Sequence, residues 1–158
     1  MAKDNRINFR SSETLAAILS EYLSTESTSS VINKQLIMFD HIMCSSIPPL
    51  LNNEWLAIFD ALNGVWVNNV EEYVNAESLT FRVRDFNSYS ENLGEKWSID
   101  FDALCEKLSG LSPAESCSVY FVTDKFWKTA LLKVDDWAEI LDKINSLRTR
   151  FKPEQLEP

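Results

Sequence analysis

A short, strictly alternating segment near the N-terminus constrains this chain more than any other feature. Polar and apolar side chains alternate from Arg6 through Ile7, Asn8 and Phe9 to Arg10, which is the period of a half-buried β-strand. The next strand-like alternation begins at residue 79. A lone strand leaves its backbone N–H and C=O groups without partners unless another chain pairs with it. The sequence therefore predicts a β-ribbon that two subunits share.

Two helices are predicted directly after this segment. Ser11 and Ser12 offer N-cap oxygens, and apolar residues then recur at helical spacing: Leu15, Ile18, Leu19, Tyr22 and Leu23. A polar connection leads into a second helix from about Ser29 to Met43. This second helix is apolar almost all round, as expected of a helix that is covered both by its own chain and by a partner.

A proline pair divides the chain, because Pro48 and Pro49 each disfavour helix in the residue before them. We expect domains at residues 1–45 and 50–151 and a frayed tail at residues 152–158. The second domain is predicted to be helical, with helices at Asn52–Leu62, at about Asp100–Ser109, from a Ser112–Glu115 capping box onward, and after Asp135. Residues 79–86 fit both a strand and a helix face, and we favour the helix.

Two blocks of sequence in the first 44 residues resemble a known family. Arg6-Ile7-Asn8-Phe9-Arg10-Ser11-Ser12-Glu13 is similar to a basic strand that runs into a capped helix, and Ser27-Thr28-Ser29-Ser30-Val31-Ile32 with Leu36 is similar to the start of a second helix. Together, over residues 5–44, they resemble the ribbon-helix-helix DNA-binding domain. The resemblance implies that one strand and two helices form an intertwined dimer over these residues. Followed by the acidic helical C-terminal domain predicted from the rest of the sequence, this gives a mainly α fold class.

The resemblance also implies a function, that of a sequence-specific transcriptional regulator, a repressor, that reads the major groove of an operator as a homodimer. In that family alternate strand side chains face the bases, and here these are Arg6, Asn8 and Arg10. The residues implied to contact DNA phosphates are Lys3, Ser27, Thr28 and Ser29.

The distribution of charge leaves a second function open. The chain has a net charge of −9, and residues 45–158 hold 11 bases and 19 acids, a balance of −8. In the first ten residues, by contrast, Lys3, Arg6 and Arg10 accompany a single acid, Asp4. An acidic C-terminal domain suits an antitoxin-like module that neutralises a basic partner protein. The two functions do not exclude each other.

Residue types that carry catalytic or metal chemistry are few. With three glycines and one histidine, the chain offers neither a glycine-rich phosphate loop nor a catalytic imidazole cluster, and we expect neither enzyme activity nor a cofactor. His41 and Cys44 stand at a metal-ligand spacing, but a packing role is favoured over a metal site. Carboxylate pairs could suggest acid–base catalysis or cation binding, but two of the three stand at predicted helix starts, and capping is favoured. The pairs are Glu71 and Glu72, Asp100 and Asp102, and Asp135 and Asp136.

Tryptophans and cysteines indicate what forms the core and in which compartment the protein lies. The five tryptophans all follow the proline pair and are expected to build a core. Cys44, Cys105 and Cys117 form no C-x-x-C pair, which favours reduced, mostly buried thiols. No stretch of sequence is apolar over a bilayer's length, and we expect a cytoplasmic protein with no membrane partner.

Overall fold

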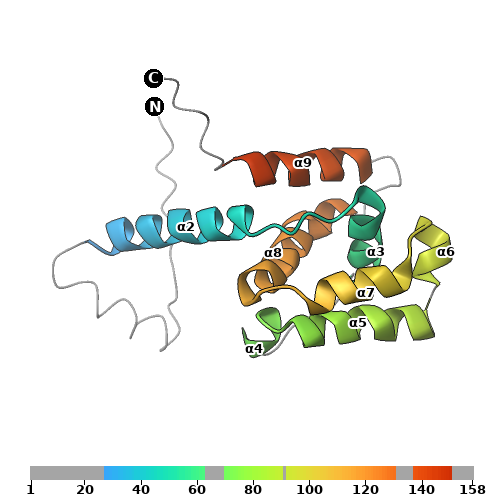
Figure 1. The fold of residues 1–158 in the computed structure, drawn as a ribbon. Coiled ribbons are helices and arrows are strands. Elements are labelled where there is room, and N and C mark those ends of the chain that lie inside the picture. Colours follow the sequence, from blue (N-terminus) through green and yellow to red (C-terminus); the bar gives the residue numbers. More distant parts are fainter. Residues whose placement is uncertain (1–26, 63–69, 91, 131–136, 151–158) are drawn as a thin grey trace, which may run out of the picture. The chain divides into compact units, whose positions relative to one another are not determined.

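The computed structural model describes residues 27–62, 70–90, 92–130 and 137–150, and every regular element in these ranges is an α-helix (Figure 1). The helices are α2 (Thr28–Ser45), α3 (Asn52–Leu62), α4 (Val70–Tyr73), α5 (Ala76–Tyr89), α6 (Leu93–Trp97), α7 (Phe101–Ser109), α8 (Pro113–Ala130) and α9 (Trp137–Thr149). The chain forms two compact units, Met1–Asp40 and His41–Pro158, and α2 runs from the first into the second. None of the helices within the described ranges has the length and apolar character needed to cross a membrane.

This architecture corrects the predicted fold class. The mainly α character is confirmed, but the ribbon-helix-helix part is wrong, because the described ranges contain helices and no strand. Residues 6–10, to which the strand was assigned, lie outside those ranges. The second strand-like stretch, residues 79–84, is helical within α5, because its apolar residues Leu79 and Val83 pack into the core from one side of a helix. No described segment therefore offers the edge with which a lone strand would pair.

Several helix starts follow from local sequence, as predicted. Asp100 caps α7 by accepting a hydrogen bond from the Ala103 amide at 3.0 Å. At the start of α8 the Ser112 hydroxyl accepts from the Glu115 amide at 3.3 Å, while the Glu115 carboxylate accepts from the Ser112 amide at 2.8 Å. This is the predicted capping box, with Pro113 at the first helical position. These hydrogen bonds satisfy amide groups that the helices themselves leave unpaired.

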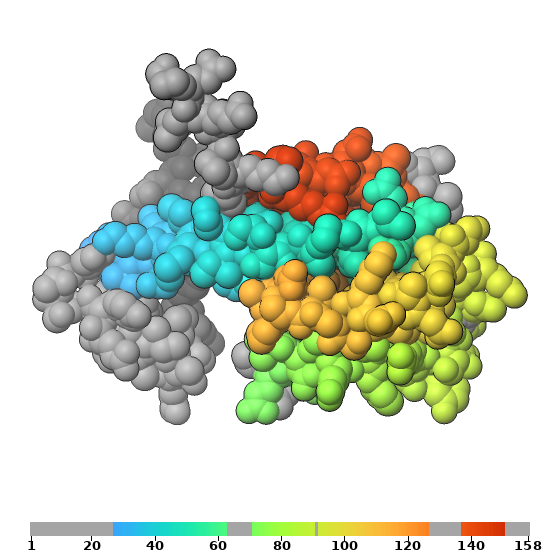
Figure 2. Space-filling model, viewed as in Figure 1, coloured from blue at the N-terminus to red at the C-terminus, as the bar shows by residue number. Residues whose placement is uncertain are grey.

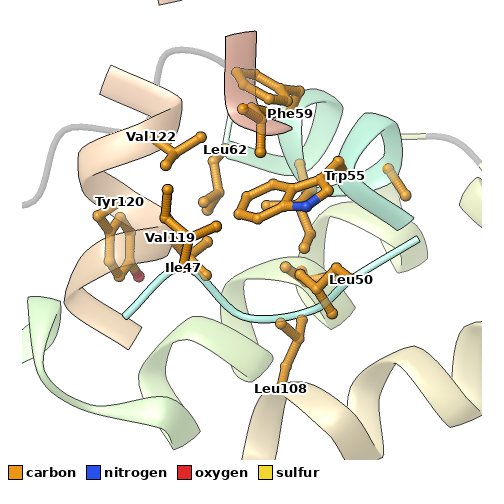
Figure 3. Packing of buried hydrophobic residues seen from close by; sticks show 14 of the residues in the cluster. Ile47, Leu50, Trp55, Phe59, Leu62, Leu108, Val119, Tyr120 and Val122 are labelled. Carbon is orange, nitrogen blue, oxygen red and sulfur yellow. The ribbon is translucent and has the colours of Figure 1, made fainter. Parts of the chain in front are cut away.

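Helix α3 lies at the centre of the second unit, in contact with α5, α6, α8 and α9. Its five consecutive apolar residues, Trp55, Leu56, Ala57, Ile58 and Phe59, are all buried. Figure 3 shows the Trp55 indole at the middle of this core, with Phe59, Leu50 and Val119 around it. A helix that is enclosed on all sides by other helices can bury a continuous apolar run, because no face is left for water.

Polar contacts fix α3 against the surrounding helices. The Glu54 carboxylate is buried and accepts from the Leu51 amide at 2.7 Å and from Lys107 Nζ at 2.5 Å. At the other end of the helix Asp60 accepts from Trp97 Nε1 at 2.6 Å and from Lys96 Nζ at 2.9 Å. Buried carboxylates are tolerated only when they are paired in this way.

The loop before α3 is held from α9. The Arg148 guanidinium donates to the Pro48 carbonyl and, at 3.2 Å, to the Leu50 carbonyl, and it lies 5.9 Å from the centre of the Trp55 ring. Burial lowers the pKa of Arg148 from its ordinary value. A planar guanidinium can donate to two carbonyls and lie over an aromatic ring at once, whereas a lysine ammonium has no planar face to place on the ring.

Candidate functional site

The residues predicted to contact DNA lie at the edge of the described structure or beyond it. Lys3, Arg6, Asn8 and Arg10 are outside the described ranges. Ser27, Thr28 and Ser29 stand together at the start of α2, and the Ser27 hydroxyl accepts from the Ser30 amide at 3.3 Å. That contact is an ordinary N-cap, which a helix needs with or without a phosphate ligand. The assignment of these residues to DNA stays a prediction.

The predicted packing roles are confirmed for the cysteines and for three of the tryptophans, whereas His41 is exposed. Cys44 and Cys105 are buried free thiols, and Cys117 is partly buried, which raises its pKa. Trp55, Trp97 and Trp137 lie in or against the core, where the rings of Trp97 and Trp137 are 6.0 Å apart. In the described part of the chain, no group of three or more His, Cys, Asp and Glu side chains is placed to hold a metal ion. The side chains of Trp66 and Trp127 and the pair Asp135 and Asp136 fall outside what the structure describes.

An exposed apolar run on α2 is the first candidate functional surface. It consists of the four consecutive residues Leu36, Ile37, Met38 and Phe39, whose exposed fractions lie between 47% and 66%. Consecutive residues of a helix point about 100° apart, so these four side chains extend around most of its circumference. Within the described residues these four side chains are uncovered, and the prediction that a partner chain shares in covering this helix is not tested by a single chain. Exposed apolar side chains gathered in this way mark an interaction surface.

The outer face of α5 is the second candidate surface. Leu79, Thr80 and Val83 turn one side of this helix into the core. Four exposed residues at intervals of four alternate between acid and aromatic along the other side: Glu77, Phe81, Asp85 and Tyr89. Phe81 is 68% exposed and Tyr89 is 85% exposed. Each step of four residues advances about 6 Å along the helix, so the alternation forms a continuous stripe.

This stripe lines a groove with a volume of about 610 Å³, which α4, the end of α3 and α5 form within the second unit. Three acids, Glu72, Glu77 and Asp85, and one base, Arg82, line it, which gives a net charge of −2. The Arg82 guanidinium forms an ion pair with the Glu72 carboxylate, so the positive charge of the groove is already compensated. Glu77 and Asp85 remain as the carboxylates of the exposed stripe.

The α5 stripe was not predicted from the sequence. Residues 79–86 allowed two secondary structures, and the stripe exists only if the segment is a helix, because a strand would place Phe81 and Asp85 beside other neighbours. The signal that was present is the spacing of four between acid and aromatic residues from Glu77 to Tyr89. The Asn75 side chain supports the helical alternative, since it caps α5 by accepting from the Glu77 and Ser78 amides at 2.9 and 3.2 Å.

The two surfaces differ in chemistry, one apolar and without a charged side chain, the other acidic and aromatic. The likeness of residues 5–44 to the ribbon-helix-helix family is not tested by the structure, because most of these residues lie outside the described ranges. Comparisons of the chain with protein-family models, with curated proteins and with solved structures found no match.

Proposed function

We propose that the protein is a self-associating interaction protein, in which the apolar run of α2 on one chain packs against the same run on a second copy. The observation that carries this proposal is the exposure of Leu36, Ile37, Met38 and Phe39 in the single chain. The cost of keeping such side chains in water is removed when a second apolar surface covers them. The acidic unit His41–Pro158 is then the part that the dimer presents to partners.

A second copy suits this surface better than a charged partner does. The run itself contains no charged residue, and the whole of α2 carries one base, Lys34, and one acid, Asp40, so its net charge is zero apart from His41. Two chains of net charge −9 repel each other least along such an element. Dimers with two-fold symmetry place the same patch of both subunits at the interface, and a patch without charge meets no like charge there.

The expected strength of this association is modest. Full burial of an aliphatic or aromatic side chain is worth about 1.5–3 kcal/mol. A partner helix covers one side of α2, so each chain buries about two of its four half-exposed side chains, and the two copies together contribute roughly 3–6 kcal/mol before the costs of association are counted. The α2 contact is therefore expected to be reversible, and the mass of the protein should be measured over a range of concentrations.

Sedimentation equilibrium of the full chain tests the proposal. The chain mass is 18.1 kDa, so a dimer has twice that mass, 36.2 kDa, and we expect the measured mass to approach this value as the protein concentration rises. Ile37→Lys introduces a charge into the run and should leave the protein at the monomer mass. Leu51→Lys is the matched control, because Leu51 is 65% exposed and Ile37 is 66% exposed, but Leu51 precedes α3.

Two results would contradict self-association through α2. One is a wild-type protein that stays monomeric at every concentration, which would mean that the apolar run of α2 does not bind a second copy of the chain. The other is a dimer that Ile37→Lys does not weaken while Leu51→Lys does, which would place the interface elsewhere.

The proposed compartment is the cytoplasm. The three cysteines are free, and Cys44 and Cys105 are buried among core residues, where a thiol behaves as a small apolar side chain. Proteins of oxidising compartments commonly use such residues in disulfides.

A further inference from the structure

We propose that the acidic and aromatic groove of α5 is a docking site for a basic segment of a partner protein, one in which lysine or arginine residues are interspersed with apolar residues. This site is separate from the α2 run, and the proposal does not depend on self-association. It concerns a binding surface formed within the second unit alone.

The exposed stripe supplies both kinds of contact that such a segment needs. The carboxylates of Glu77 and Asp85 can accept hydrogen bonds from ammonium or guanidinium groups, and charge-assisted hydrogen bonds of this kind are stronger than neutral ones. The rings of Phe81 and Tyr89 offer faces on which a cation or an apolar side chain can lie. Aromatic residues of this kind dominate the binding energy of many protein interfaces.

The charge of the groove decides between a basic and an acidic occupant. The ion pair between Arg82 and Glu72 leaves no uncompensated base among the residues that line the groove, whereas Glu77 and Asp85 leave two acids. An acidic peptide or a nucleic acid would meet repulsion from these two carboxylates. A basic segment meets opposite charge, which also speeds its diffusional encounter with the site.

The exposed stripe of α5 is supported by packing on the opposite side of the helix. The inner face of α5 packs against α3, α7 and α8, and in Figure 2 α5 and α7 form neighbouring strips of the surface. The stripe residues themselves are exposed, and none of the four belongs to the buried core. Substitutions in the stripe should therefore alter binding and leave folding intact.

Fluorescence anisotropy with a defined probe tests the site. The probe is a labelled amphipathic peptide of lysine and leucine, and its control is the same peptide with glutamate in place of every lysine. We expect the lysine peptide to bind the full chain at low salt and the glutamate peptide not to bind. Affinity should fall as salt is added, because screening weakens interactions between exposed charges.

Matched variants locate the binding on α5. The pair Phe81→Ala and Tyr89→Ala should weaken binding of the lysine peptide at least about tenfold, as loss of aromatic anchors does elsewhere. The pair Glu77→Gln and Asp85→Asn should weaken it roughly three- to tenfold and flatten its dependence on salt. The control pair is Asp124→Asn and Asp142→Asn, which makes the same change in charge at exposed acids outside the groove and should alter affinity less than about twofold.

Three outcomes would overturn the proposal. The first is no binding of the lysine peptide at low salt, and the second is unchanged affinity in the Phe81 and Tyr89 double variant. The third is equal weakening of binding by the Glu77 and Asp85 double variant and by the Asp124 and Asp142 control, which would show that the peptide binds through the overall negative charge of the protein. The same titration on the Ile37→Lys chain separates the two surfaces, since peptide binding that disappears there belongs to α2 and also contradicts the α5 site.

Discussion

Two helices of this protein each contain a run of consecutive apolar residues, but the run in α3 is buried and the run in α2 is exposed. In α3 the five residues from Trp55 to Phe59 are at most 8% exposed, whereas in α2 the four residues from Leu36 to Phe39 are all at least 47% exposed. The difference lies in the surroundings, because α3 meets four other helices of its own unit. An apolar run shows that a helix needs cover on every side, but it does not show whether the same chain provides that cover.

The comparison is sharpest for one substitution made at two isoleucines, since Ile58 is fully buried and Ile37 is 66% exposed. Ile58→Ala should lower the free energy of unfolding by about 2–5 kcal/mol, because it removes buried methyl groups and leaves a cavity. Ile37→Ala should change it by less than about 0.5 kcal/mol at concentrations where the protein is monomeric. Urea unfolding measures both values. Equal losses at the two positions would show that α2 is covered within the single chain.

The next largest effect concerns the contact that closes the α3 core from α9. Arg148→Ala should cost roughly 1.5–3 kcal/mol, because two loop carbonyls, those of Pro48 and Leu50, lose a charged donor. Arg148→Lys should recover only part of this loss, since an ammonium group lacks the guanidinium fork. Arg84→Ala, at an exposed position on α5, serves as the control in the same unfolding experiment. Full recovery by lysine would mean that charge alone matters at this position.

Helix capping extends the comparison to the ends of α2 and α8. Ser112→Ala should cost about 1 kcal/mol, because it breaks the reciprocal hydrogen bonds with Glu115. Ser27→Ala should cost less, since its capping contact is with Ser30 alone and no glutamate returns the bond. Differential scanning calorimetry of the two variants measures this order. If Ser27→Ala lowered stability more than Ser112→Ala, the expected order would be wrong, and the cap of α2 would contribute more to stability than the cap of α8.

The capping box also has a dependence on pH. The Ser112 hydroxyl and amide donate to Glu115 and lower the pKa of its carboxyl below the ordinary value of 4.5. A pKa that is lower in the folded state stabilises the fold above the unfolded pKa, and this stabilisation is lost as the pH falls through the folded pKa. The difference in stability between the wild type and Ser112→Ala should therefore shrink below about pH 4.5.

The smallest effect at neutral pH is expected at Tyr120, whose buried hydroxyl makes no hydrogen bond of good geometry within the described residues. Tyr120→Phe should change stability at pH 7 by less than about 1 kcal/mol, because no well-formed bond is lost. Burial raises the pKa of Tyr120 to about 12, from an ordinary value of 10. The unfolded state therefore releases this proton first, and stability should fall between pH 10 and pH 12. A Tyr120→Phe protein that declines equally over this range would contradict the shift.

Local sequence predicted the helices whose ends carry their own signals. Asp100 before α7 and the Ser112–Glu115 box before α8 were identified because a cap depends on residues that are neighbours in sequence. The apolar residues of the segment from 79 to 86 fit two periods, and the favoured helix is confirmed, because the Asn75 cap and the contacts of α5 with α3, α7 and α8 all select it. The α5 stripe was missed although this helix was favoured, because the prediction used only the apolar residues of the segment and not the exposed acids and aromatic residues four apart.

By itself the sequence determined that this chain is mainly α, where several of its helices begin, and that its cysteines stay free, because these properties depend on periodicity, caps and composition. Only the tertiary structure decided which apolar run is buried and which exposed face combines Glu77, Phe81, Asp85 and Tyr89 beside a groove. Burial depends on which elements surround a residue. That is a property of contacts between distant parts of the chain, and no short window of sequence contains it.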